Sequence, residues 1–290
     1  MRREILMEAI LISDLHLIDR PIFSRKDDTY QTQFEKLKFI FDYAKKNDIE
    51  YIFQAGDMFD KPRSYRLLED FMELLSKYSF SVYCVSGQHD MLFRNIKNTN
   101  MSILNKTGYL KILNDQPVFI DSVFIYGQSW NQKDIPKVND KTQKNLLVAH
   151  SPIALEKNYH GHNLVDFQKL KDFRFVLCGD IHKEFFKDNI LNTGPMLRKD
   201  ITLKKHNPCF YVLDWIEKKP NVKRIEIPFI SDVFEEKIEL QGFDKQGFDD
   251  FIEEIQMKNE TSFGFYDILK ISIENEPKEI QEIIYELEKE

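Results

Sequence analysis

The sequence has little of what marks a secreted or membrane-spanning protein. Its 290 residues include only three cysteines, Cys84, Cys178 and Cys209, which are scattered along the chain. Such a pattern indicates neither a disulfide framework nor a zinc knuckle. The first apolar run, Ile5–Ile12, is short and is interrupted by Glu8, so we interpret it as a strand and not as a signal peptide or transmembrane span. These absences predict an intracellular, cytoplasmic protein with no membrane partner.

Internal repeats, low-complexity tracts and long Gly/Ser linkers are absent as well. The composition, 42% hydrophobic and 31% charged, is typical of a globular protein. A chain of this length can bury a full core, and one large domain with a smaller one is the natural expectation.

The net charge of -7 is unevenly distributed. Residues 232–290 contain 18 acidic and 6 basic side chains, whereas residues 1–231 contain 30 acidic and 35 basic ones. The first part of the chain is therefore positive, and the acidic total does not exclude a polyanionic substrate. Several cations follow the motifs described below, among them Arg63, Arg94 and Arg198. They are either solvated loop charges or contacts for phosphate groups.

Strands and helices alternate over the first 90 residues. Apolar residues recur at helical spacing in Gln33–Lys46 and again in Tyr65–Tyr78, each between β-rich runs. This alternation predicts βαβ units and a largely parallel sheet. Short β-like runs between residues 108 and 150 predict a second sheet packed on the first, and residues 209–229 resemble a hairpin. The expected fold class is a layered α/β sandwich.

After Asp232 the acidic part of the chain repeats strand then helix twice, which is enough for a small α+β domain. We therefore predict two domains, residues 1–231 and residues 232–290.

Five short motifs rich in aspartate and histidine dominate the larger domain. Each follows an apolar, β-rich run, which places it at the carboxyl end of a predicted strand, where open α/β sheets bind their ligands. In chain order they are Asp14-Leu15-His16, Gly56-Asp57-Met58-Phe59-Asp60, Gly87-Gln88-His89-Asp90, Ala149-His150-Ser151-Pro152 and Gly179-Asp180-Ile181-His182.

The residue types in these motifs suit a pair of divalent cations. Asp14 and His16 are two residues apart, so on an extended strand end both point to the same face. The carboxylate of Asp57 can bridge two cations, and His150 with the Asp180/His182 pair can complete the coordination. Two such cations can activate a water and stabilise an in-line phosphoryl displacement. Any one of these residues alone could be a strand-terminal polar group or a helix cap.

In these motifs the chain resembles the calcineurin-like metallophosphoesterase superfamily, and most closely its SbcD-type DNA-repair nucleases. The stretch Asn192-Thr193-Gly194-Pro195-Met196-Leu197-Arg198 is similar to a segment of that nuclease family, and residues 232–290 resemble its capping domain. The resemblance implies a first metal held by Asp14, His16, Asp57 and His182, and a second held by Asp57, Gln88, His150 and Asp180. It also implies that His89 contacts the scissile phosphate and protonates the leaving group, with Asp90 orienting its imidazole.

Two residues depart from the superfamily pattern at the second metal. Gln88 replaces the usual asparagine and Asp180 the usual histidine, which gives that site more oxygen ligands. We therefore expect two Mn²⁺ ions, with Mg²⁺ as the alternative, and the opposing possibility is a weak second site.

The resemblance implies a Mn²⁺-dependent DNA nuclease of DNA repair or replication, an exonuclease with endonuclease action left open. DNA is the expected partner, and an SbcC-type coiled-coil ATPase and a homodimer are family expectations. The helices that usually dock on the ATPase would follow Glu290, so docking by that route is not expected. Two alternatives stay open, a small-molecule phosphoesterase and a catalytically quiet subunit that binds DNA or an ATPase.

Overall fold

The computed structural model describes residues 5–22, 24–138, 140–155, 164–216 and 219–234. Nearly all of the predicted capping domain, 232–290, therefore lies outside the described residues, and both the domain and its boundary stay predictions. Val233 and Phe234, the last described residues, are buried against the larger domain, where Phe234 forms a β-bridge with Arg25.

The first sheet has six strands in the order β12-β11-β1-β2-β3-β4. Strands β1, β2, β3 and β4 run parallel, with β4 at the edge, and β11 and β12 add an antiparallel hairpin beside β1. The strands are β1 (Ile5–Ile12), β2 (Tyr51–Ala55), β3 (Ser81–Val85), β4 (Lys111–Ile112), β11 (Cys209–Ile216) and β12 (Lys219–Glu226). The predicted parallel sheet and hairpin are thus both present.

The second sheet, also of six strands, has the order β5-β6-β7-β8-β10-β9. Its inner strands are parallel, and antiparallel strands occupy both edges. The strands are β5 (Val118–Ile120), β6 (Val123–Gln128), β7 (Asn145–His150), β8 (Phe175–Gly179), β9 (Phe185–Lys187) and β10 (Ile190–Asn192). Short 3₁₀ turns, η1 (Phe167–Leu170) and η2 (Ile201–Leu203), lie in the connecting loops.

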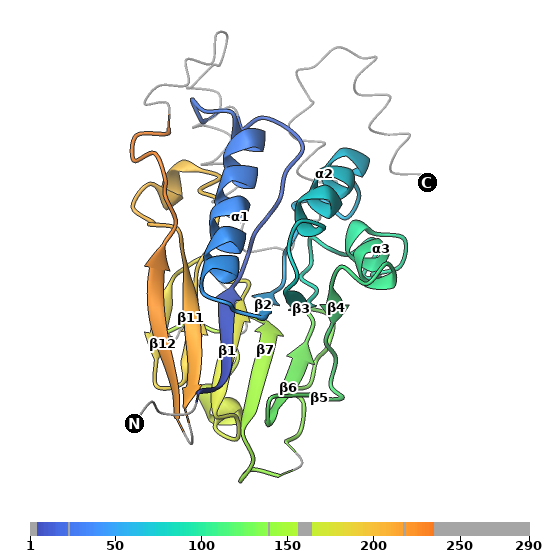
Figure 1. The fold of residues 1–290 in the computed structure, drawn as a ribbon, viewed down its shortest axis with the longest axis vertical. Helices are drawn as coiled ribbons and strands as arrows, with labels where there is room; N and C mark the ends of the chain where they lie inside the picture. The colour runs from blue at the N-terminus through green and yellow to red at the C-terminus, as the bar shows by residue number, and fades with distance from the viewer. Residues whose placement is uncertain (1–4, 23, 139, 156–163, 217–218, 235–290) are drawn as a thin grey trace, which may run out of the picture. The chain divides into compact units, whose positions relative to one another are not determined.

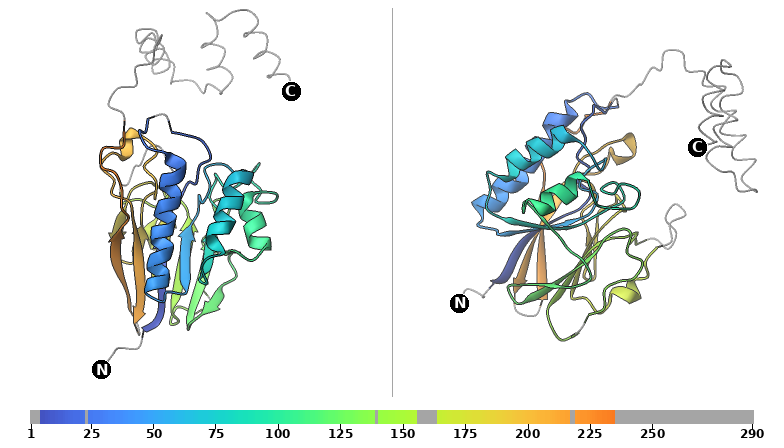
Figure 2. Two further views of the ribbon diagram at one scale, coloured as in Figure 1. Left: turned by 45° about the horizontal axis from the view of Figure 1, so that its top comes forward. Right: turned by 90° about the vertical axis from the view of Figure 1, so that its right-hand side faces the viewer.

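Three apolar clusters separate the layers. One lies between the sheets and joins Leu11 and Phe53 of the first sheet to Val148 and Leu177 of the second. Another packs the helices onto the outer face of the first sheet (Figure 1). The third covers the outer face of the second sheet with η1 and loops. The two sheets packed face to face, seen in Figure 2, confirm the predicted layered α/β sandwich.

Side-chain caps determine where the helices begin. α1 (Thr29–Lys46) starts after Asp28, which accepts a hydrogen bond from the Gln31 amide, and so begins four residues earlier than its apolar periodicity predicts. α2 (Tyr65–Leu75) is capped by Ser64 and α3 (Asn100–Lys106) by Thr99. Among the described residues no helix is both long and apolar enough to cross a bilayer, and the three cysteines are buried free thiols.

Lys36 on α1 is an unusually buried cation. Its Nζ donates to the carbonyl of Met196 at 3.1 Å. Burial, with the nearby charges of Arg25 and Arg198, lowers the pKa of Lys36 to about 7. In the unfolded chain the lysine binds its proton up to its ordinary pKa of about 10.4. Between these two values the unfolded state binds more protons, so stability should rise with pH.

Lys36→Met should therefore flatten the rise in the free energy of unfolding between about pH 7 and pH 10. At pH 7 it should add about 1–3 kcal/mol, because the gain from removing a buried cation is offset by one lost hydrogen bond. Urea unfolding at a series of pH values measures both effects. Equal slopes for the two proteins would refute this account.

Candidate metal centre

The five motifs meet where five parallel strands of the two sheets end. Three motifs follow β1, β2 and β3 of the first sheet, and two others end β7 and β8 of the second. The carboxyl ends are joined by hydrogen bonds, since the Asp14 amide donates to the Gly56 carbonyl (3.2 Å) and the Asp180 amide donates to Asp14 Oδ1 (3.1 Å). The sheet topology thus brings together residues that are up to 168 positions apart in sequence.

The four residues expected at the first metal are in mutual contact. Nε2 of His16 lies 2.9 Å from Nε2 of His182 and 3.6 Å from Oδ2 of Asp57. Nε2 of His182 lies 3.8 Å from Oδ1 of Asp14. Ligand bonds of about 2.1 Å place neighbouring octahedral ligands roughly 3 Å apart. These separations therefore suit one divalent cation.

The four residues expected at the second metal also converge. Nε2 of His150 lies 2.9 Å from Oε1 of Gln88, 3.4 Å from Oδ2 of Asp57 and 3.8 Å from Oδ1 of Asp180. The Gln88 amide nitrogen donates to Oδ1 of Asp180 at 3.1 Å. The longer glutamine side chain thus reaches the same cluster, and Oδ2 of Asp57 faces both groups.

Contacts behind the histidines set which ring nitrogen is available. Nδ1 of His150 donates to the carbonyl of Ala55 at 2.8 Å, which leaves Nε2 directed into the cluster. His16 has no hydrogen bond at Nδ1, but that atom lies 3.8 Å from Oδ1 of Asp60. Both rings can therefore present Nε2 to a cation.

Buried charge in the cluster is unbalanced. Oδ2 of Asp14 and Oδ2 of Asp57 are buried and have no hydrogen-bond donor. Burial and the neighbouring Asp57 carboxylate raise the pKa of Asp14 to about 7. Burial lowers the pKa of His150, but the hydrogen bond and charge of Asp57, together with the carboxylates of Asp14 and Asp180, raise it to about 10. Protons on Asp14 and His150 thus compensate the buried carboxylate charge in the absence of metal, and a divalent cation can take their place, so the donor set fits metal ions.

Left-handed backbone aims four of these side chains. Asp14, His16, Asp57 and Asp180 have φ angles of 48°, 46°, 50° and 85°. Residues other than glycine rarely adopt such angles, and they concentrate at functional sites. The sequence motifs carry no direct signal for this strain.

Glycine is required beside the cluster because a side chain would collide with the ligands. A Cβ atom on Gly87 would lie 2.0 Å from Oδ1 of Asp57 and 2.5 Å from its backbone nitrogen. A Cβ on Gly56 would lie 2.3 Å from Nδ1 of His150. Glycine at positions 56 and 87 thus allows the backbone of these motifs to lie close to His150 and Asp57.

Gly87→Ala should weaken metal binding by at least tenfold, because Asp57 must move away from the alanine methyl group. Isothermal titration with Mn²⁺ measures the change. Gly108→Ala is the matched control, since a Cβ there meets nothing within 4 Å but the residue has a φ of +81°. It should cost about 1 kcal/mol of stability and leave metal affinity intact. Equal affinities for the two variants would contradict this reading.

His89 lies at the edge of the cluster and is partly exposed. Its ring is 5.0 Å from that of His16, and its backbone amide donates to Oδ1 of Asp57 at 2.9 Å. Nδ1 contacts the carbonyl of Asp60 at 3.0 Å, which fixes the ring and leaves Nε2 for a substrate.

Asp90 has a different role from the expected one. We predicted that its carboxylate orients the His89 ring, but the ring is held by the Asp60 carbonyl. Asp90 instead accepts hydrogen bonds from the backbone amides of Met58, Phe59 and Gly87. It therefore stabilises the loops that carry Asp57 and Gln88, and the predicted contact with His89 is wrong.

Of the three predicted phosphate contacts, Arg198 is the one that the structure corrects. It is buried and its guanidinium donates to the carbonyls of Lys204, Ile230 and Ser231. Arg63 is exposed and donates to the Asn98 carbonyl, and Arg94 is also exposed. Burying a guanidinium without hydrogen-bond acceptors would be costly, and these carbonyls supply the acceptors. Arg198 therefore stabilises the fold.

The cation that reaches the centre from this segment is Lys199, one of the cations that follow the motifs but not one of the three predicted phosphate contacts. Its Nζ donates to Oδ1 of Asp60 at 2.7 Å, and its charge lowers the pKa values of His16 and His182, in each case after the larger effect of burial. In the sequence, the available indication of a role for Lys199 was its position directly after Arg198.

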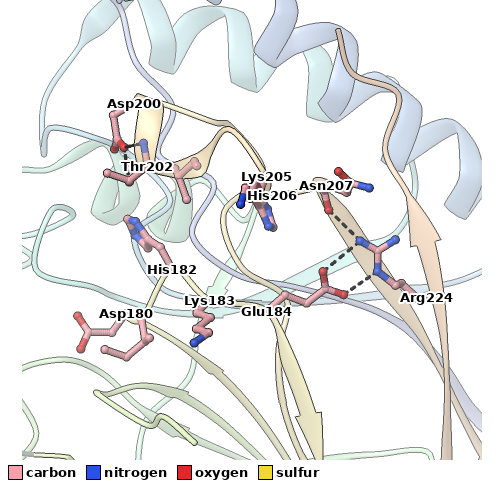
Figure 3. A pocket seen from close by; sticks show the side chains of 12 residues that line it. Asp180, His182, Lys183, Glu184, Asp200, Thr202, Lys205, His206, Asn207 and Arg224 are labelled. Atoms are coloured by element: carbon pink, nitrogen blue, oxygen red, sulfur yellow. Dashed lines mark hydrogen bonds and ion pairs between the residues drawn. The ribbon is translucent and has the colours of Figure 1, made fainter. Parts of the chain in front are cut away.

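A cavity of about 820 Å³ adjoins the cluster (Figure 3). Asp180 and His182 line one end, and the ion pair of Glu184 with Arg224 lines another part of the wall, with Nε and Oε1 2.6 Å apart. Lys205, which also lines the wall, adds positive charge. The cavity is large enough for a small ligand and opens directly beside two of the candidate metal ligands.

Comparisons with known proteins agree with this geometry. A sequence model of the calcineurin-like phosphoesterase family matches residues 7–184, which include all five motifs. The DNA double-strand break repair protein Mre11 of Nanoarchaeum equitans (strain Kin4-M) is 23% identical over 257 residues, covering 76% of this chain and 69% of that protein.

Solved structures show a similar fold. A dimetal phosphatase from Danio rerio has a TM-score of 0.52 and 11% identity, covering 78% of this chain and 100% of that chain. The protein TT1561 of Thermus thermophilus has a TM-score of 0.51 and 12% identity, again covering 78% of this chain and 100% of that chain. At such identities the similarity concerns the fold alone.

Proposed function

We propose that this chain, which belongs to the calcineurin-like phosphoesterase family, is a two-metal nuclease that hydrolyses phosphodiester bonds in DNA. One observation carries the proposal, the convergence of the other candidate ligands around Asp57, with unpaired buried carboxylate oxygens at Asp14 and Asp57. The distant Mre11 relative, named for DNA double-strand break repair, favours DNA as the substrate and repair as the setting.

The residues divide into two ligand groups that share Asp57. Asp14, His16, Asp57 and His182 would hold one cation, and Asp57, Gln88, His150 and Asp180 the other. When bound, two divalent cations activate a water and neutralise the charge that develops on the phosphoryl oxygens. His89 would donate a proton through Nε2 to the leaving oxygen, because its Nδ1 is occupied by the Asp60 carbonyl.

We further propose that both sites prefer Mn²⁺, with Mg²⁺ as the weaker alternative. Every candidate ligand offers either an oxygen or an imidazole nitrogen, and among the described residues no cysteine belongs to a candidate metal-binding group. The oxygen donors suit Mn²⁺ and Mg²⁺, and a donor set without thiolate lacks the ligands that select the softest ions. Calorimetry should find two Mn²⁺ per chain. A stoichiometry of one at saturation would refute a complete second site at Gln88 and Asp180.

Cleavage of end-labelled single-stranded and double-stranded DNA in Mn²⁺ tests the nuclease proposal. Release of label as mononucleotides would identify an exonuclease, and internal fragments an endonuclease. Hydrolysis of nucleotides or aryl phosphodiesters without DNA cleavage would select the small-molecule phosphoesterase instead. Metal binding without hydrolysis of any of these substrates would select a quiet subunit that binds DNA or an ATPase.

Partners are a separate part of the proposal. We propose DNA as the ligand, and the SbcC-type ATPase and the homodimer stay family expectations. Sedimentation of the purified chain, alone and with an SbcC-type ATPase, would test both.

A further inference from the structure

A tight turn directly after His89 breaks a strong local rule. Leu92 and Asn95 form an antiparallel bridge in which each amide donates to the other carbonyl, at 2.8 and 2.9 Å. The two residues between them, Phe93 and Arg94, have φ angles of 49° and 59°. Two-residue turns with positive φ at both central positions strongly favour Asn-Gly, so Phe-Arg is an unfavourable pair there.

This unfavourable turn displays an aromatic ring to solvent. Phe93 is 94% exposed, so burial does not compensate for its backbone strain. Backbone strain that burial of the Phe93 ring among the described residues does not offset, four residues after the proposed proton donor, points to a role in contact with a ligand.

The neighbouring Arg94 is held by a second aromatic residue. Its guanidinium carbon lies 5.9 Å from the ring centre of Trp130, which is 38% exposed. Trp130 is fixed beside the motif loop, because its amide donates to the carbonyl of Ser86 at 2.9 Å. The turn and Trp130 are thus anchored to the same loop that carries Gln88 and His89.

Charge around the turn is positive. Residues 91–106 contain no aspartate or glutamate and include Arg94, Lys97 and Lys106. An exposed aromatic ring among cations and without acidic neighbours in this segment complements a strand of unpaired bases and phosphates better than an apolar protein face.

We propose that Phe93 is a stacking platform for an unpaired nucleobase of the substrate strand next to the scissile phosphate. Arg94, held against Trp130, contacts the flanking phosphate. The inference rests on the proposed nuclease function and adds a substrate class, strands whose bases are unpaired at the cleavage point.

Phe93→Asn tests the stack without disturbing the turn, because asparagine tolerates positive φ better than phenylalanine. The affinity of metal-free protein for a labelled oligothymidylate is compared with that for an abasic oligonucleotide of equal length, by fluorescence anisotropy. The wild type should prefer the base-containing strand by roughly tenfold to a hundredfold, as one stacked base provides. The variant should lose most of that preference and melt at the same temperature or higher. Phe119→Ala, which removes another exposed aromatic ring on β5, is the control and should keep the preference.

Equal affinity of the wild type for the two strands, or an unchanged preference in Phe93→Asn, would overturn the inference. A variant that changes only its sedimentation would also overturn it, by identifying the ring as a contact between copies of the chain. DNA cleavage in Mn²⁺, assayed in parallel, separates the two proposals. Absent cleavage refutes the nuclease, whereas the binding comparison decides the platform by itself.

Discussion

Asp57→Asn is expected to reduce hydrolysis by at least about 10³-fold. Oδ2 of Asp57 faces the imidazoles of His16 and His150, at 3.6 and 3.4 Å, and belongs to both ligand groups. In the proposed ligand assignment this one carboxylate serves both cations, so its loss would remove a ligand from two sites at once. The remaining amide oxygen is a weaker ligand than a carboxylate.

The same substitution should leave the metal-free fold intact. Oδ1 of Asp57 accepts from the His89 amide at 2.9 Å, a bond that asparagine can keep. The substitution removes the charge that raises the pKa of His150, so His150 becomes neutral and its Nε2 can accept a hydrogen bond from the new amide group. A neutral hydrogen-bonded pair thus replaces a buried charged one, so the metal-free variant should melt close to the wild-type temperature.

Thermal melting with and without Mn²⁺ distinguishes these effects. At a metal concentration of about 100 times Kd the wild type should gain about 2.7 kcal/mol for each bound ion, and the variant should gain almost nothing. Asp115→Asn, the same chemical change at an exposed residue, is the control and should keep the full metal response. A variant that still responds to Mn²⁺ as the wild type does would refute the bridging role.

The convergence of the motifs was predictable because the order and direction of the strands determine where each motif lies in space. Motifs at the carboxyl ends of parallel strands lie at one edge of a sheet, whatever their separation in sequence. The ligand groups around Asp57 therefore follow from five β-rich runs and the residues after them. The resemblance to a known superfamily added the division into two groups, and the structure places each group together.

Side-chain environment was much less predictable. Nothing in the sequence distinguishes Arg198, whose guanidinium is buried among carbonyls, from the exposed Arg94. The role of Asp90 was wrongly predicted for a similar reason. Its position next to His89 in sequence suggested a contact with that ring, but its carboxylate accepts hydrogen bonds from backbone amides instead. Tertiary hydrogen bonds decide both cases, and they have no local sequence signal.

Local structure that depends on strain or short segments was also missed. α3 has only seven residues, too few for a periodic pattern, and its cap at Thr99 was the one local indication. The left-handed backbone of Asp14, His16 and Asp57 runs against residue preference, because the site and not propensity determines it.

His89→Ala should keep two Mn²⁺ ions per chain and still lose about 10²–10⁴-fold in DNA cleavage, the contribution of a positioned proton donor. Metal binding should survive because the contact between residue 89 and Asp57 is made by the backbone amide, which alanine retains. The imidazole, by contrast, is held at Nδ1 by the Asp60 carbonyl and has only Nε2 available for the leaving oxygen.

The leaving group provides the decisive comparison. Departure of a nucleoside alkoxide needs a proton, whereas p-nitrophenolate is stable as an anion and leaves without one. His89→Ala should therefore hydrolyse DNA far more slowly than the wild type, and the loss should be in kcat. On the p-nitrophenyl ester of thymidine monophosphate the variant should be much less impaired, with little change in kcat. Equal losses on both substrates would mean that His89 binds the phosphate or positions Asp57, and does not donate the proton. Because both substrates carry the same phosphate and nucleoside, the difference between their losses measures the proton transfer alone.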